Sequence, residues 1–198
     1  IEVGKTISAE DIENEYDAIV ICTGASIKRE LPIPGSELKG VEQAMDFLPH
    51  NYRAVVGQHE RNTRFLAKNK NVIVIGGGDT GSDCIGTSIR QGALSVTQLE
   101  IMPRPPDIEN KFLTWPNWPL KMRTSSSQEE GAEREFSVMT DKFTGKNGSV
   151  SQLHCIRVDE KFSPIKGSEF SLKADLVLLA MGFVSPETSG MISDLGLD

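Results

Sequence analysis

The residues of this chain best suited to chemistry form a glycine-rich turn that directly follows an apolar run. Residues 72 to 75 predict a buried strand, and the turn after them has the spacing G-x-G-x-x-G. In such a turn the first glycine permits a tight reversal, the second lets the backbone approach a pyrophosphate, and the third lets a helix pack against the strand. Free N–H groups at the start of that helix then face the anion. The predicted dinucleotide-binding residues are Gly76, Gly77, Gly78, Asp79, Thr80 and Gly81.

A G-x-G-x-x-G spacing also occurs where a strand simply has to reverse sharply, so a purely structural turn is the alternative interpretation. The flanking sequence favours the nucleotide site, because an apolar strand precedes the turn and residues 83 to 91 predict a helix after it. We therefore predict that the turn binds NADPH or NADH.

The group that reads the adenosine ribose is expected at the end of the next strand, which we place at residues 93 to 101. Glu100 lies near the customary offset of about 20 residues from the glycine turn and could accept a hydrogen bond from a ribose 2′-hydroxyl, as in NAD-dependent proteins. Arg104 could instead pair with the 2′-phosphate of NADP, with Arg90 as a helper. Each of the three could equally be a solvated surface side chain, and the sequence leaves the choice of coenzyme open.

Two further apolar runs predict the strands that must frame this turn. Residues 16 to 25 end in a Thr-Gly pair, and residues 173 to 183 end in a similar Met-Gly pair. Both runs predict buried strands. Between the first run and the glycine turn, residues 29 to 36 form a Pro/Gly-rich connector that indicates a domain crossing, and residues 41 to 48 predict a short helix.

The second half of the chain predicts an antiparallel meander after a long loop. The prolines after Arg104 exclude a long helix there, and Trp115 and Trp118 are expected either to cover an edge of the sheet or to approach the coenzyme. A short solvated helix is predicted over residues 128 to 136. Strands are predicted over residues 137 to 144, 150 to 158 and 169 to 172. The predicted fold class is α/β: a Rossmann-like domain with a parallel βαβ unit and an antiparallel meander.

Composition excludes several classes of function. The net charge of −7 disfavours nucleic acid or an anionic membrane as a partner, and no apolar run is long enough to cross a bilayer. We expect a soluble, cytoplasmic protein, with an organellar location left open. The three cysteines and three histidines lack the spacing of metal ligands, clusters or nucleophilic triads. We accordingly predict no catalytic residue and no metal ligand.

Several segments together resemble the NAD(P)H-binding region of the glutamate synthases, in the small subunit or the fused C-terminal part. The segments are residues 71 to 92, the run Leu-Glu-Ile-Met-Pro-Arg-Pro-Pro at 99 to 106, the two Trp-Pro pairs at 115 to 119, and residues 174 to 182. The same flavoprotein family includes the electron-entry part of dihydropyrimidine dehydrogenase, which is the runner-up. A nucleotide-binding module that transfers no electrons is the non-enzymatic alternative.

The resemblance implies that an NAD(P)H domain is inserted into an FAD domain, with Gly24 and Gly182 at the two crossings, near the flavin and nicotinamide. It implies hydride transfer to FAD, then electron passage through iron–sulfur clusters to the site that makes glutamate from 2-oxoglutarate and glutamine. The implied partners are the FAD-binding and iron–sulfur segments of the same polypeptide, and the large subunit or fused amidotransferase and synthase region.

The domain limits expected from the resemblance divide the chain into three parts. Residues 1–50 would be a remnant of the FAD-binding domain with the connector, residues 51–172 the NAD(P)H-binding domain, and residues 173–198 the return strand. No FAD fingerprint precedes the first of these parts, and no cysteine-rich cluster segment is present. We therefore expect a piece of a larger polypeptide that does not hold FAD stably by itself.

Overall fold

The structure, a computed structural model, describes residues 1–59 and 62–197. Contacts within the chain divide it into two units. The larger is Leu31–Met181, and the smaller combines Ile1–Glu30 with Gly182–Asp198. These limits differ from the domain limits expected from the sequence, because strands β2 (Val41–Gln43) and β9 (Leu176–Leu179) pair into the sheet of the larger unit. The assignment of the smaller unit to an FAD-binding domain stays a prediction.

The centre of the larger unit is a parallel sheet of five strands in the order β2-β9-β3-β4-β5. The central strands β3 and β9 are rich in Val, Ile and Leu because both faces of the sheet are covered there, as is usual for parallel sheets. Their bounds are β2 (Val41–Gln43), β3 (Asn71–Ile75), β4 (Ser95–Leu99), β5 (Glu133–Glu135) and β9 (Leu176–Leu179).

An antiparallel meander of three strands belongs to the same unit. Its strands are β6 (Val138–Lys146), β7 (Ser149–Arg157) and β8 (Phe170–Lys173), in that order. The turn between the first two contains Asn147 and Gly148, which both have positive φ, at 52° and 77°. An Asn-Gly pair with two positive φ angles suits the tight hairpin turn whose twist matches that of its strands.

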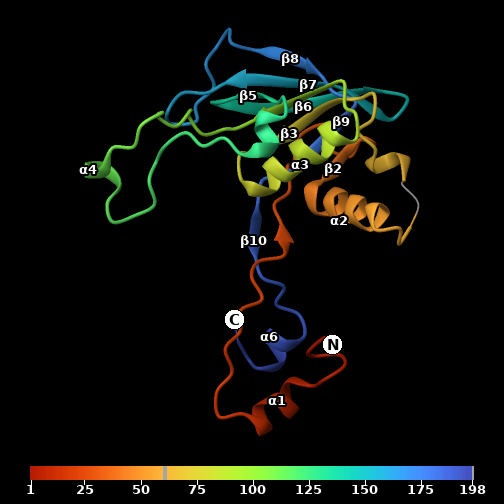
Figure 1. Ribbon diagram of the computed structural model, residues 1–198, viewed down its shortest axis with the longest axis vertical. Coiled ribbons are helices and arrows are strands. Elements are labelled where there is room, and N and C mark those ends of the chain that lie inside the picture. Colours follow the sequence, from red (N-terminus) through yellow and green to blue (C-terminus); the bar gives the residue numbers. More distant parts are fainter. Residues whose placement is uncertain (60–61, 198) are drawn as a thin grey trace. The chain divides into compact units, whose positions relative to one another are not determined.

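Two cores place the parallel sheet between the helices and the meander (Figure 1). Val72 and Val74 of β3 pack with Phe47 of α2 (Ala44–Val55) and Ile85 of α3 (Asp79–Arg90). Alternate residues of the same strand face the opposite way and pack with β6 and β7 in the second core. Side chains alternate along a strand, so β3 is buried from Val72 to Ile75 and both layers fix its carboxyl end.

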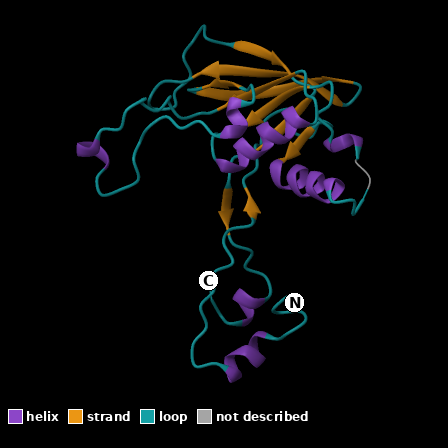
Figure 2. Cartoon of the chain, viewed as in Figure 1, coloured by secondary structure: helices purple, strands orange, loops and turns teal. Residues whose placement is uncertain are grey.

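The remaining elements are short, and Figure 2 shows them between long loops. In the larger unit they are η1 (Thr63–Phe65), α4 (Lys111–Thr114) and α5 (Ser126–Glu129). The smaller unit contains α1 (Ala9–Glu15), α6 (Met191–Asp194) and the antiparallel pair of β1 (Ile27–Lys28) and β10 (Phe183–Ser185). No helix within residues 1–59 and 62–197 is long and apolar enough to cross a membrane.

The predicted fold class is confirmed: a parallel β-α-β unit, β3-α3-β4, is combined with an antiparallel meander. The strand predicted at residues 16 to 25 is wrong, because that stretch has no regular structure and Tyr16 and Val20 are exposed. An apolar run becomes a stable strand only when a neighbouring strand pairs with its backbone. Within the described part of the chain, no strand pairs with this run.

Two helix predictions also need correction. Residues 41 to 48 form β2 followed by the start of α2, because Val41–Gln43 pairs with β9 at the edge of the sheet. Residues 128 to 136 hold only the end of the one-turn helix α5, followed by β5, which pairs with β4. In both places pairing with a sheet outweighs local helix propensity.

Candidate coenzyme site

The glycine turn begins directly after the carboxyl end of β3, and its first residue has a backbone conformation that only glycine adopts readily. Gly76 has φ of +125°, and a Cβ added to it would overlap the carbonyl oxygen of Ala180 at the end of β9. Its N–H donates to the carbonyl of Leu99 at the end of β4, at 2.9 Å. The turn is thus closely confined between the ends of its two neighbouring strands.

Gly78 and Gly81 meet two different requirements. A Cβ added to Gly78 would have no atom within 4 Å, whereas one added to Gly81 would overlap the carbonyl oxygen of Gly76. Gly81 therefore lets α3 pack closely on the turn, and Gly78 leaves open space beside it. These are the roles of the third and second glycines in a dinucleotide-binding turn.

Open space at Gly78 lies at the amino end of α3. Gly78 is the N-cap of this twelve-residue helix, and no side chain caps it. The first N–H groups of a helix have no partner within the helix, and together with the helix dipole they attract an anion. Gly77 and Thr80 are half-buried and Asp79 is exposed, so the turn is accessible from one side.

The structure brings Glu100 to this turn. Glu100 directly follows β4, and a Cβ added to Gly77 would overlap its carboxylate. One carboxylate oxygen, Oε1, accepts a hydrogen bond from the N–H of Met102 at 3.1 Å. That bond fixes the side chain against the backbone of Gly77, where the ribose of a bound dinucleotide is expected.

Arg104 and Arg90 are engaged elsewhere. Arg104 pairs with Asp107 in the exposed loop after β4, at 2.7 Å. Arg90, at the end of α3, pairs with Glu130 just after α5. Exposed ion pairs contribute little stability, so neither pair would prevent an arginine from exchanging partners.

Gly24 and Gly182 both belong to the smaller unit, whereas the glycine turn and Glu100 belong to the larger one. Both glycines have positive φ, at +70° and +81°. A Cβ added to either would meet no atom within 4 Å. Their placement near a flavin stays a prediction.

A polar network behind the glycine turn escaped the sequence analysis. Gln98 is only 1% exposed, and its side chain bonds to the carbonyl of Gly76, to Gln128 and to Arg134. Gln128 belongs to a capping box with Ser125, and the Ser125 hydroxyl meets that of Ser82 in α3. The pattern Ser-x-x-Gln at 125 to 128 could have revealed the start of α5. A glutamine within an apolar strand was the other available signal.

Arg134 of β5 lies close to the charged residues after β4. Burial lowers the pKa of its guanidinium, the charge of Arg104 lowers it further, and the charge of Glu100 raises it. Arg134 also donates to the carbonyl of Arg123, at 2.9 Å, and lies over the ring of Phe136. Positive charge is therefore held at the same end of the sheet as Glu100.

Trp115 and Trp118 are 80% and 77% exposed, so the expectation that they cover an edge of the sheet is wrong. Trp118 instead lies beneath the guanidinium of Arg123, with 4.2 Å from Cζ to the ring centroid. A surface hollow is lined by the tryptophans and the residues around them. An approach of these rings to the coenzyme stays a prediction.

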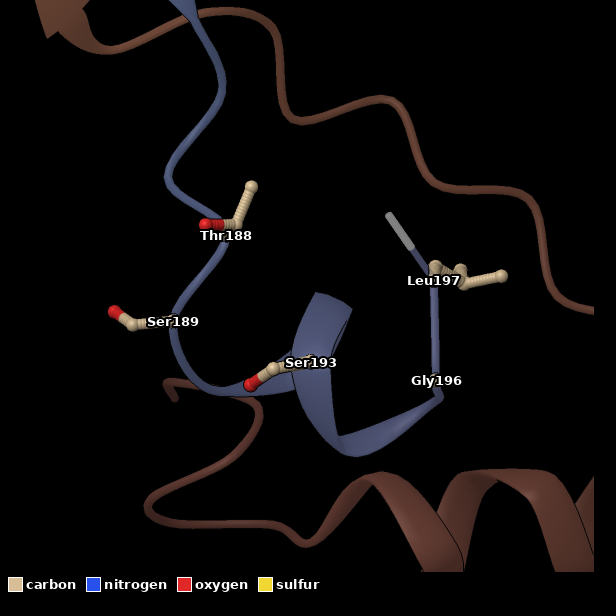
Figure 3. A pocket seen from close by; sticks show the side chains of 5 residues that line it. All are labelled: Thr188, Ser189, Ser193, Gly196 and Leu197. Carbon is tan, nitrogen blue, oxygen red and sulfur yellow. The ribbon is translucent and has the colours of Figure 1, made fainter.

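The smaller unit contains a hollow of its own, around α6 (Figure 3). It is lined by Thr188, Ser189, Ser193, Gly196 and Leu197. None of the predicted site residues lies in it. Among residues 1–59 and 62–197, no group of three or more His, Cys, Asp or Glu could hold a metal ion.

Comparison with known proteins identifies the family. Residues 1–197 match the model of the pyridine nucleotide-disulphide oxidoreductases. The chain is 52% identical over its whole length to the glutamate synthase [NADPH] small chain of Mycobacterium tuberculosis strain H37Rv, of which it covers 42%. It is 40% identical to the glutamate synthase [NADH] of Saccharomyces cerevisiae, with 94% of this chain and 9% of that protein aligned. The chain thus spans less than half the length of these curated relatives.

Solved structures share the fold. The FprA protein of Mycobacterium tuberculosis, solved in complex with NADPH, matches with a TM-score of 0.61 and 18% identity, covering 96% of this chain and 55% of FprA. The thioredoxin reductase of T. acidophilum matches with a TM-score of 0.56 and 19% identity, covering 87% and 45%. The resemblance to glutamate synthases seen in the sequence is confirmed by the first two relatives, and this chain belongs to the pyridine nucleotide-disulphide oxidoreductase family.

Proposed function

We propose that this chain is the NAD(P)H-binding part of a glutamate synthase. In this proposal it holds the coenzyme so that hydride passes to FAD, and the electrons then support glutamate synthesis from glutamine and 2-oxoglutarate. FAD, iron–sulfur clusters and the synthase active site would belong to further parts of the polypeptide or to a larger partner chain. The names of the two glutamate synthase relatives support this assignment.

One observation carries the proposal: in the glycine turn, the glycines that pack against the fold have no room for a side chain, and the glycine expected beside the coenzyme borders open space. Gly76 and Gly81 are confined by neighbouring backbone, yet Gly78 borders open space at an uncapped helix terminus. A purely structural turn would have no need for that open side. Gly77, Gly78, Asp79 and Thr80 would hold the pyrophosphate through their backbone N–H groups.

The protein supplies binding and orientation in this proposal. When bound, NAD(P)H supplies the hydride, and such a transfer needs a stacked, aligned geometry more than an acid or a base. Gly24 and Gly182 are proposed to line the nicotinamide and flavin side, as the family resemblance implies.

Of the two candidate readers of the ribose, Glu100 is better placed. Its carboxylate lies against Gly77, whereas Arg104 is paired with Asp107 in the loop. With Oε1 held by the N–H of Met102, Oε2 remains to accept a hydrogen bond from a ribose 2′-hydroxyl. A 2′-phosphate at the same place would be repelled by the carboxylate. We propose that NADH binds more tightly than NADPH.

Calorimetric titration of the chain with NADH and NADPH, each at moderate salt, tests the proposal. Binding of either coenzyme that is lost in a Gly78→Val variant would support the site, and the tighter coenzyme would identify the reader of the ribose. The absence of binding to both would contradict the coenzyme site in this chain.

Electron transfer requires the whole polypeptide. Bleaching of its flavin absorbance by NADH, slowed by the same Gly78→Val change, would support the oxidoreductase assignment. Coenzyme binding without flavin reduction would favour the non-catalytic nucleotide-binding module instead.

A further inference from the structure

Gln98 occupies a position where an apolar side chain is expected. It lies in β4 with Val96 on the same face of the sheet, toward α3, and it is only 1% exposed. Glutamine is seldom buried so completely, because its amide loses water on burial and must find partners in the protein. The hydrogen-bond partners of Gln98 indicate the role of a glutamine at this position.

Its amide makes three hydrogen bonds. Nε2 donates to the carbonyl oxygen of Gly76 at 2.9 Å, and Oε1 accepts from Gln128 Nε2 at 2.9 Å and from Arg134 Nε at 3.1 Å. The guanidinium of Arg134 only donates, so the oxygen of Gln98 must face it. The NH₂ group must then face Gly76, and the orientation of the amide is fixed by chemistry.

This bond holds the Gly76 carbonyl on the inner side of the turn. The oxygen accepts a hydrogen bond from the amide of Gln98, and a Cβ on Gly81 would overlap the same oxygen. In a planar trans peptide unit the C=O and the following N–H point in opposite directions. The N–H of Gly77 therefore points away from Gln98.

The peptide unit between Gly76 and Gly77 would otherwise rotate easily. Both flanking residues are glycines, which accept conformations that other residues avoid, and Gly76 already has φ of +125°. A rotated unit would present a carbonyl oxygen to the coenzyme in place of an N–H group. The partial negative charge of that oxygen would repel a phosphate.

We propose that Gln98 is a positioning residue of the coenzyme site, which keeps the Gly76–Gly77 peptide unit turned so that its N–H faces the pyrophosphate. The inference rests on the proposed function, because it assumes that a pyrophosphate binds at this turn. Arg134 holds the Gln98 oxygen from the side opposite Gly76, and this bond keeps the amide oriented when Gln128 is replaced.

A Gln98→Met variant tests this role, with Gln128→Met as the matched control. Both changes remove a buried glutamine from the same network, but only the first removes the partner of the Gly76 carbonyl. The test is the Kd for ADP by calorimetry, together with the melting temperature of each variant. Gln98→Met is expected to raise the Kd about tenfold or more, as for the loss of one charge-assisted hydrogen bond. Gln128→Met is expected to leave the Kd within about twofold, with a similar loss of melting temperature.

A spectroscopic readout follows the peptide unit itself. In the unaltered chain, the Gly77 amide resonance is expected to shift strongly on addition of ADP, because its N–H meets a phosphate. In Gln98→Glu, which keeps the acceptor for Arg134 but loses the donor to Gly76, that shift is expected to be lost. If Gln98→Met does not fold, Gln98→Glu takes its place in the ADP-binding test.

The outcomes separate the inference from the proposed function. Equal ADP binding by Gln98→Met and the unaltered chain, or an unmoved Gly77 resonance on binding of ADP, would overturn the role of Gln98 alone. Equal losses in Gln98→Met and Gln128→Met would also overturn it, because the network would then act only through stability. A chain that binds neither ADP nor NADH would overturn the proposed function, and the inference with it.

Discussion

The clearest test of the glycine turn is Gly78→Val, because the structure predicts that it affects binding and spares folding. A Cβ at Gly78 has no atom within 4 Å, and the residue has φ of −81° and ψ of −173°, which valine accepts readily. Replacing a glycine N-cap by an aliphatic residue costs about 0.5–1 kcal/mol. Valine also has fewer backbone conformations than glycine in the unfolded chain, which stabilises the folded state by about 0.4–1 kcal/mol.

The net change in the free energy of unfolding is therefore close to zero. For a chain of this size the melting temperature should shift by less than about 4 °C. Binding should respond very differently, because the valine side chain occupies the open space beside the uncapped helix terminus. Losing two charge-assisted hydrogen bonds at about 1.5–3 kcal/mol each would raise the Kd for NADH more than about a hundredfold.

Thermal melting and calorimetric titration of the same samples measure both effects, and Gly76→Ala provides the contrast. Alanine at position 76 would overlap the Ala180 carbonyl and strain a φ of +125°, so this variant should lose stability as well as binding. If Gly78→Val melted as low as Gly76→Ala, the space beside Gly78 would not be open. If it bound NADH normally, the coenzyme would not lie at this turn.

Three further predictions concern other parts of the chain. Glu100→Ala should weaken NADH by about 1–3 kcal/mol and should strengthen NADPH, because the carboxylate that repels the 2′-phosphate is gone. Arg104→Ala should weaken NADPH alone if that arginine reads the 2′-phosphate. Titration with both coenzymes checks both changes, and equal losses for both coenzymes in either variant would refute them. Burial raises the pKa of the Cys84 and Cys155 thiols to about 12. A thiol reagent at pH 8 should therefore modify only the exposed Cys22 in the native chain and all three cysteines in denaturant. Rapid modification of more than one cysteine in the native chain would contradict this. Burial disfavours the charged form of Asp175, but hydrogen bonds from Asn71 and the charges of Lys173 and Lys70 outweigh it and hold its pKa below the usual value. Asp175→Ala should therefore cost about 1–3 kcal/mol of unfolding free energy at pH 7, and the difference from the unaltered chain should shrink as the pH falls through the folded-state pKa of Asp175; a difference independent of pH would contradict it.

Local sequence was sufficient to predict the structure wherever one short segment contains all the residues that determine it. The strand over residues 71 to 75, the glycine turn and the helix from Asp79 follow one another directly, and each is specified by apolar periodicity or by glycine spacing. The hairpin turn at Asn147 and Gly148 is a second example, since two residues specify its geometry. Glu100 as a candidate reader of the ribose also followed from its distance along the chain.

Tertiary structure decided every feature that depends on a distant partner. The apolar run at residues 16 to 25 resembles that of β9, yet only β9 pairs with neighbouring strands, so the two similar sequences have different structures. Residues 133–135 join the sheet because β4 lies beside them, against the helix propensity of the segment. Gln98 gives no local sign that its amide holds the carbonyl of Gly76, 22 residues earlier in the sequence. Pairing and burial of this kind arise only when the folded chain brings distant segments together, and a single sequence does not specify them locally.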